Sequence, residues 1–210
     1  VDIFTADMLS ETREARQRGI PTHTPMPKAI GRGSDRPQWM RNMLHVNRGD
    51  GSWAQVADAA GVAATDWTWG SAFLDVDLDG FEDLLAVNGH RWDIRDADTF
   101  DRIRNGFPRV PWDEEQAQFP RLATRSVALR NNGDLTFRTM PDGWGLADAD
   151  AISQGIALAD FDLDGDLDLG VTRPDAPAQL FRHAPTAAPL PGRAPGAGGG
   201  GEGEGTGIGR

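Results

Sequence analysis

Short apolar runs separated by tight turn signals dominate the hydrophobic pattern of this chain, and the pattern occurs twice. Residues 44–53 match residues 128–137, and each stretch carries an Asn-x-Gly-Asp turn. Further along, residues 70–85 match residues 155–170, and each of these is built around an acidic Asp-Gly loop. Apolar runs of this length between such turns predict small antiparallel strands joined by tight loops.

A unit of small hairpins cannot bury its own apolar face, so copies of the unit are expected to pack against one another. The pattern therefore predicts an all-β fold, a partial β-propeller with short helical insertions. Val1 opens the chain without an initiator Met, and Asp2 stands where Asp83 and Asp168 stand in the two copies. We therefore expect the chain to begin inside a further repeat and the remaining blades of a parent propeller to be its partners.

The repeat pattern also predicts where the chain divides. The expected segments are the end of a preceding blade with an insertion (1–36), a first propeller repeat (37–90), an insertion (91–121), a second repeat with the start of the next (122–183) and a tail (184–210). The tail is dominated by Gly, Pro and Ala. Such a segment buries too little apolar surface to offset its chain entropy, so disorder is expected there.

Two short helices are expected in the insertions. Ser10 is a candidate N-cap and Gly19 a candidate C-terminal residue for a helix over about residues 11–18, which leads into a Pro-rich loop. In the second insertion, apolar residues at helical spacing predict a helix capped by Asp96 or Asp98. These apolar residues are Phe100, Ile103 and Phe107.

The acidic loops carry the candidate chemistry, since each places carboxylates at positions 1, 3, 5 and 9 around a Gly at position 6. Ca²⁺ takes 6–8 oxygen ligands, and alternate residues of a tightly wound loop turn their side chains toward one centre. Position 7 is expected to contribute its backbone carbonyl. The predicted calcium ligands are Asp75, Asp77, Asp79, Phe81 and Asp83 in the first loop, and Asp160, Asp162, Asp164, Asp166 and Asp168 in the second.

Two other interpretations of these loops compete with calcium binding. Asp and Gly are common turn formers, so an acidic hairpin loop can be solvated and free of metal. Against that, four spaced carboxylates repel one another without a counter-ion, and the motif occurs twice in register. Mg²⁺ is the competing ion, but its octahedral geometry and tightly held waters suit a carboxylate-rich loop less well than Ca²⁺ does. The prediction is two calcium sites, one in each loop, with Gly80 and Gly165 required by the backbone.

Composition narrows the function classes. The net charge is −11, with 32 acidic against 21 basic residues, so the chain repels a phosphate backbone, and nucleic-acid binding is not expected. The absence of cysteine removes disulfides and thiolate chemistry. No apolar run approaches the roughly 20 residues of a membrane span, so membrane insertion is not expected.

These motifs resemble FG-GAP/VCBS repeats, the calcium-loop repeats of integrin-type β-propellers. More narrowly, residues 38–53, 60–62, 66–69 and 75–89, together with the opening 4–9, resemble the cartilage acidic protein and ASPIC/UnbV-type bacterial proteins. The resemblance covers about residues 1–183 and departs from the family at the tail, where further blades would be expected. It implies a seven-bladed extracellular or cell-surface propeller with calcium in its blade loops, and it implies no reaction.

Other residue groups are weaker candidates. His45, His90 and Asp93 can be imagined as a metal or acid/base group, but nothing in their spacing holds them together. The Trp cluster is a possible sugar platform, although aromatics in small blades more often fill the core between sheets. It consists of Trp53, Trp67 and Trp69. Residues 48–50 spell Arg-Gly-Asp, yet the second copy has Asn132 at the Arg position, which favours a turn role over adhesion.

The expected function is a non-catalytic binding or scaffold module of an exported protein, in an extracellular, periplasmic or cell-surface location. Calcium loops of extracellular modules bind with Kd of about 10⁻⁴–10⁻³ M and would be largely empty in the cytosol. The ligand is an unidentified protein or glycan. The alternative is a set of substrate-binding blades in a polysaccharide-processing enzyme, for which the sequence offers no demonstrable nucleophile or carboxylate pair.

Overall fold

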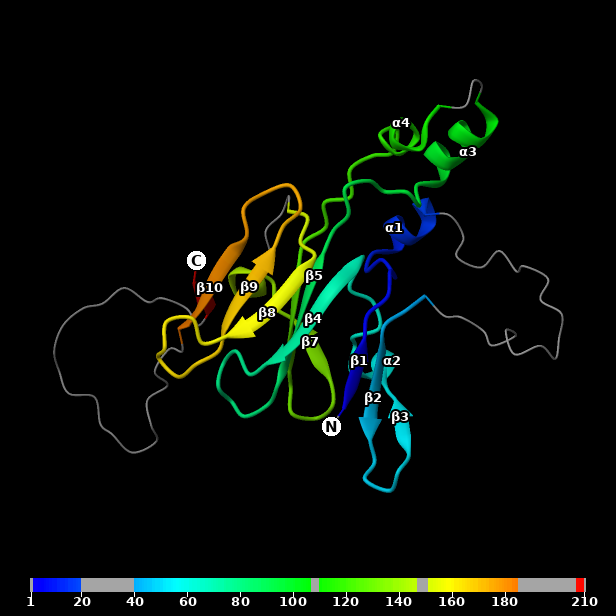
Figure 1. Cartoon of the computed structure of the whole chain (residues 1–210). Helices are drawn as coiled ribbons and strands as arrows, with labels where there is room; N and C mark the ends of the chain where they lie inside the picture. The colour runs from blue at the N-terminus through cyan, green and yellow to red at the C-terminus, as the bar shows by residue number, and fades with distance from the viewer. Residues whose placement is uncertain (1, 20–39, 107–109, 147–150, 185–206, 210) are drawn as a thin grey trace, which may run out of the picture.

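The computed structural model describes residues 2–19, 40–106, 110–146, 151–184 and 207–209. In these ranges the chain forms three antiparallel sheets whose faces pack together in series (Figure 1). The all-β prediction is confirmed at this level. The three sheets do not close into a ring.

The first sheet has the order β1-β2-β3 and contains β1 (Ile3–Thr5), β2 (Met43–Asn47) and β3 (Trp53–Gln55). The middle sheet runs β4 (Thr68–Leu74), β5 (Asp83–Asn88), β6 (Val127–Asn131) and β7 (Phe137–Thr139). The third sheet contains β8 (Gly155–Ala159), β9 (Asp168–Thr172), β10 (Gln179–Ala184) and β11 (Gly207–Gly209). Each sheet is therefore a meander of neighbouring strands.

The sheets do not coincide with the repeats of the sequence. The first copy contributes β2 and β3 to one sheet and β4 and β5 to the next, while β6 and β7 come from the second copy. The expected segments 37–90 and 122–183 thus each span two sheets. Because each complete sheet needs hairpins from two successive copies, neither sequence copy forms a sheet on its own.

Strand β5 shows how the layers are held together, since all six of its residues are buried. Leu85 and Val87 face the third sheet, in a cluster with Leu169, Val171 and Phe181 among others. The alternate residues Leu84 and Ala86 belong to the cluster between the middle and first sheets. Side chains alternate across a strand, so a continuous apolar run bounded by turns is what a strand covered on both faces requires.

Gly70 sets the distance between the middle and third sheets. A Cβ atom added there would lie 3.0 Å from Ile156 Cγ2 and 3.1 Å from the backbone oxygen of Gln154. Strand β4 can therefore approach β8 closely only because residue 70 has no side chain.

The helices agree with the sequence in part. Helix α1 (Arg13–Arg18) is capped by Thr12, whose Oγ1 accepts from Ala15 N at 3.2 Å, so the predicted Ser10 cap is wrong by two residues. Helix α3 (Ala97–Asn105) begins at the predicted cap Asp96, whose carboxylate accepts from Thr99 N at 2.8 Å.

Three short elements were not predicted. They are α2 (Ala57–Ala60), α4 (Trp112–Gln116) and the 3₁₀ turn η1 (Gly143–Gly145). The strand β11 falls inside the segment that was expected to be a disordered tail and pairs with β10. Ala184, the first residue of that segment, is the last residue of β10. Residues 185–206 and 210, the Pro-rich loop before residue 40 and Phe107 lie outside the described residues.

Candidate metal centre

The two acidic loops close equivalent hairpins at the end of the molecule opposite helices α3 and α4 (Figure 1). Residues 75–82 connect β4 to β5, where Leu74 pairs with Asp83. Residues 160–167 connect β8 to β9, where Ala159 pairs with Asp168. Asp83 and Asp168 are therefore the first residues of their strands, so the sheet fixes their backbone positions while the loop folds back over them.

The first carboxylate of each loop winds the backbone around itself. Asp75 accepts hydrogen bonds from Asp79 N at 3.0 Å and Gly80 N at 2.9 Å. In the second loop Asp160 accepts from Asp164 N and Gly165 N, both at 3.1 Å. The same donors at the same spacing show that the two loops share one local structure.

The backbone of each loop requires two left-handed residues. Gly80 and Gly165 have φ of 91° and 101°, and a Cβ atom at either would meet nothing within 4 Å. The predicted need for glycine is therefore conformational and not steric. Leu78 and Leu163, two positions earlier, also have positive φ, at 55° and 61°. Bulky residues adopt this region only at an energetic cost.

The last carboxylate of each loop is buried and held on both oxygens. Asp83 Oδ1 accepts from Asn131 N at 2.8 Å, and its Oδ2 accepts from Val76 N at 3.0 Å. Asp168 accepts in the same way from His183 N at 2.8 Å and Phe161 N at 3.0 Å. These bonds join each loop to the third strand of its sheet.

The first sheet preserves one part of this arrangement. There Asp2 accepts from Asn47 N at 2.9 Å, the contact that Asp83 makes with Asn131. The structure thus places Asp2 in the position that the sequence comparison predicted.

Burial raises the pKa of Asp83 to about 6, against the opposing effect of its two backbone hydrogen bonds. The nearby carboxylates of Asp77 and Asp79 raise this pKa further. A buried carboxyl among like charges favours a cation beside it, because a cation removes the repulsion that raises the pKa.

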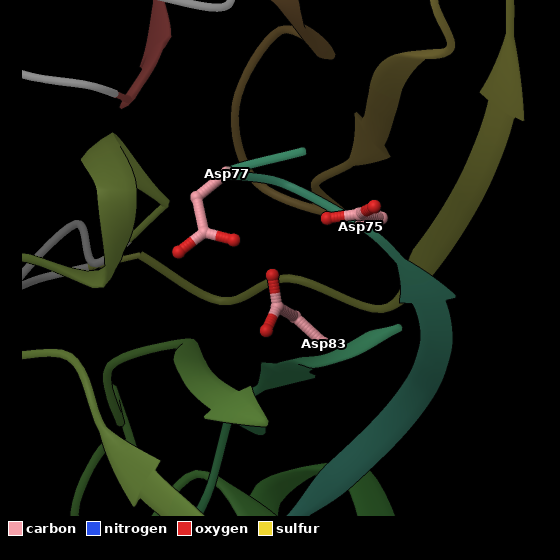
Figure 2. A group of neighbouring side chains, drawn as sticks. All are labelled: Asp75, Asp77 and Asp83. Atoms are coloured by element: carbon pink, nitrogen blue, oxygen red, sulfur yellow. The ribbon is translucent and has the colours of Figure 1, made fainter. Parts of the chain in front are cut away.

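Three carboxylates of each loop converge, as Figure 2 shows for Asp75, Asp77 and Asp83. In each triad one oxygen from every residue lies within 4.8 Å of the others. The second triad consists of Asp160, Asp162 and Asp168. Asp77 Oδ1 is buried without a hydrogen-bond partner, a costly state that an ion bound in the triad would relieve.

Asp79 and Asp164, at position 5, are turned to other partners. Asp79 Oδ1 accepts from Phe81 N at 2.9 Å, and its Oδ2 pairs with Arg130 at 2.6 Å. Asp164 does the same with Asp166 N at 3.1 Å and Arg182 at 2.9 Å. The structure therefore brings together three of the four carboxylates predicted for each site and holds the fourth beside an arginine.

The two arginines are the residues that sequence reasoning missed. Arg130 on β6 also pairs with Asp77 Oδ2 at 2.5 Å, and Arg182 on β10 pairs with Asp162. Each arginine directly precedes the residue whose backbone N–H binds the buried carboxylate, Asn131 or His183. That repeated position could have revealed them. The first sheet has Val46 there.

The charge balance still favours a bound cation. The first loop contains four carboxylates, those of Asp75, Asp77, Asp79 and Asp83. Arg130 brings one positive charge to them and pairs with two, Asp77 and Asp79. Arg130 contacts Oδ2 of Asp77 and leaves Oδ1 without a partner. Hard oxygen ligands of this kind, supplied by carboxylates, fit Ca²⁺.

The weaker candidates do not form a second metal site in the described part of the chain, where the two triads are the metal-ligating clusters. The ring of His90 stacks on Trp67 at 4.9 Å and on Trp69 at 5.7 Å. Trp67 is buried, whereas Trp53 lies on β3 in another sheet. The three tryptophans therefore do not make one sugar platform.

The aspartate of the Arg-Gly-Asp segment stabilises the turn in which it lies. Asp50 accepts from Ser52 N at 2.8 Å, and Asp134 in the second copy accepts from Thr136 N at 3.0 Å. The shared contact accounts for the aspartate in both copies.

Comparison with protein-family models finds no match for this chain, and comparison with curated proteins finds no relative. No helix in the described ranges has both the length and the apolar composition needed to cross a membrane.

Proposed function

We propose that this chain is a calcium-binding β-module whose two loops each hold one structural Ca²⁺ ion. The observation that carries the proposal is the duplicated triad with an unpartnered, buried Asp77 Oδ1. Asp75, Asp77 and Asp83 would hold the ion in the first loop. Asp160, Asp162 and Asp168 would hold it in the second. Each ion would tie its hairpin loop to a strand of the same sheet and neutralise carboxylates that otherwise repel one another.

The module would be part of a larger β-propeller of the FG-GAP/VCBS type. Two observations support this: the sheets pack face to face in series, and the middle sheet combines hairpins from two successive sequence copies. Blades with this dependence on the next repeat are typical of architectures that need several copies.

We further propose a non-catalytic binding or scaffold role in an exported protein, for a protein or glycan ligand. Export would place the loops in millimolar calcium, where modest affinities suffice to fill them. Fractionation of cells that express the full-length gene tests the location. Recovery from the cytosol alone would contradict it.

The calcium proposal is tested by isothermal titration of the folded chain with Ca²⁺ and, separately, with Mg²⁺. Two calcium sites are expected, with weaker magnesium binding. Asp77→Asn should remove the first site and Asp162→Asn the second, since each deletes one charge of a triad. Asp101→Asn is the matched control, because Asp101 pairs with Arg104 on the exposed face of α3. A folded chain that takes up no calcium at millimolar concentration would refute the proposal.

A further inference from the structure

A continuous chain of hydrogen bonds links the two acidic loops through His183 on β10. The His183 backbone N–H donates to Asp168 at 2.8 Å, and its ring Nε2 lies 2.7 Å from the backbone oxygen of Val76. A carbonyl oxygen only accepts, so Nε2 carries the proton of this bond. Val76 N in turn donates to Asp83 Oδ2 at 3.0 Å. Three hydrogen bonds thus lead from a carboxylate of one triad to a carboxylate of the other.

All four residues of this hydrogen-bond series are buried away from water. Asp168, His183 and Val76 are each 2% exposed, and Asp83 is 0% exposed. A buried polar group that loses its hydrogen-bond partner costs about 1–3 kcal/mol. When one residue of the series moves, it is therefore easier for the next residue to move with it than for the hydrogen bond between them to break. The loops on neighbouring sheets are therefore not independent structural units.

This link depends on the histidine. Asn131 occupies the matched position on β6, where its backbone N–H binds Asp83. Its side chain is used within its own sheet, donating to Glu82 O at 3.0 Å and accepting from Gly133 N at 2.9 Å. His183 has a longer reach, and its ring crosses the interface between the middle and third sheets.

We infer that His183 couples the two calcium sites, so that filling one raises the affinity of the other. The inference rests on the proposed function. A filled first loop fixes the Val76 carbonyl, which fixes the ring of His183 and thereby the N–H group that holds Asp168. The first ion to bind loses the conformational entropy of these groups, and the second ion then binds to groups that are already ordered. By thermodynamic linkage, each site raises the affinity of the other by the same factor.

The experiment compares calcium titrations of the intact chain with those of Asp77→Asn and Asp162→Asn, which report each site alone. In the intact chain the second ion should bind about fivefold or more tightly than the isolated sites predict. His183→Asn keeps the backbone bond to Asp168 but shortens the side chain, and should reduce this factor to below about twofold. His183→Gln carries an amide N–H near the position of Nε2 and should restore it.

Ile156→Val is the matched control, since Ile156 packs across the same interface beside Gly70 without joining the hydrogen-bond chain. It should keep the coupling. Two sites that titrate independently in the intact chain, or coupling that survives His183→Asn, would overturn the inference while leaving the calcium sites in place. Absence of binding in the intact chain and in both single-site variants would refute the proposed function and the inference with it.

A second readout needs no metal. In chelator, hydrogen exchange of the Val76 amide should be faster in His183→Asn than in the parent, because the loop loses its anchor to the third sheet. Exchange in Ile156→Val should follow the parent. Equal protection of this amide in the parent and in His183→Asn would show that the bond does not hold the loop.

Discussion

Replacement of Arg130 by Gln tests what the arginine does in the first loop. Either its ion pairs with Asp77 and Asp79 stabilise the fold whether or not calcium is bound, or its positive charge stands in for that of the proposed Ca²⁺ ion. Arg130 contacts Asp77 and Asp79 with 24% of its side chain exposed, while those carboxylates are 17% and 27% exposed. In chelator, the variant leaves the four carboxylates of the first loop without their guanidinium. After allowance for solvent screening at this exposure, the loss of unfolding free energy should be on the order of 1–2 kcal/mol.

In calcium the same substitution should cost less than half as much, because the ion supplies the positive charge that the guanidinium provided. A loss of 1 kcal/mol lowers the melting temperature of a chain of this size by about 2–4 °C, so the difference is measurable. The assay is thermal unfolding of the parent and Arg130→Gln, each in chelator and in millimolar Ca²⁺. The parent should also melt at a higher temperature in calcium, because each filled site adds RT ln(1 + [Ca²⁺]/Kd) to the unfolding free energy. At millimolar Ca²⁺ and a Kd of about 10⁻⁴–10⁻³ M this amounts to roughly 0.4–1.4 kcal/mol per site.

Arg121→Gln is the control, since Arg121 pairs with Asp175 away from both loops. Its small effect should be the same with and without calcium. If Arg130→Gln costs as much in calcium as in chelator, Arg130 stabilises the sheet by packing alone. If the variant costs more in calcium, the guanidinium supports the bound state, and the reasoning that treats it as a competing charge is wrong.

Three further changes test the fold and one local charge. Leu85→Ala should cost about 2–5 kcal/mol in urea unfolding because the side chain is fully buried between two sheets, and a loss no larger than that of the half-exposed Leu180→Ala would contradict this packing. Gly70→Ala should cost about 1–3 kcal/mol through the close contact with Ile156; unchanged stability would mean that the sheets separate freely. Burial raises the pKa of Asp66, although the hydrogen bond that it accepts from Glu11 N acts in the opposite direction. The charged form of Asp66 is therefore disfavoured in the folded state. The free energy of unfolding should fall as the pH rises from the ordinary aspartate pKa through the raised one. Asp66→Asn should remove this fall in the free energy of unfolding. If the free energy of unfolding depends on pH in the same way in parent and variant between acid and neutral pH, the charge of Asp66 has no such effect.

The sequence by itself determined the local structures. The spacing of Asp75 to Asp83, with Gly80 between them, specifies a wound loop because its hydrogen bonds run between residues at most seven apart. Asp96 was identifiable as a helix cap for the same reason. Helices as short as α2 and α4 gave no signal, since four or five residues are too few for a helical period to appear.

The tertiary structure decided how the copies combine and which residues complete the sites. Repeat comparison found the hairpins but not their allotment to sheets, because strand pairing joins β5 to β6 across the intervening insertion. Arg130 meets Asp77 across 53 positions, and His183 meets Val76 across 107. The repeated position of Arg130 and Arg182 marks them as candidates in the sequence, but it does not give their partners. These contacts form only when apolar faces such as that of Leu85 are buried between neighbouring sheets. The chemistry of the loops is thus local, while their charge balance and their connection to each other depend on the packing of the sheets.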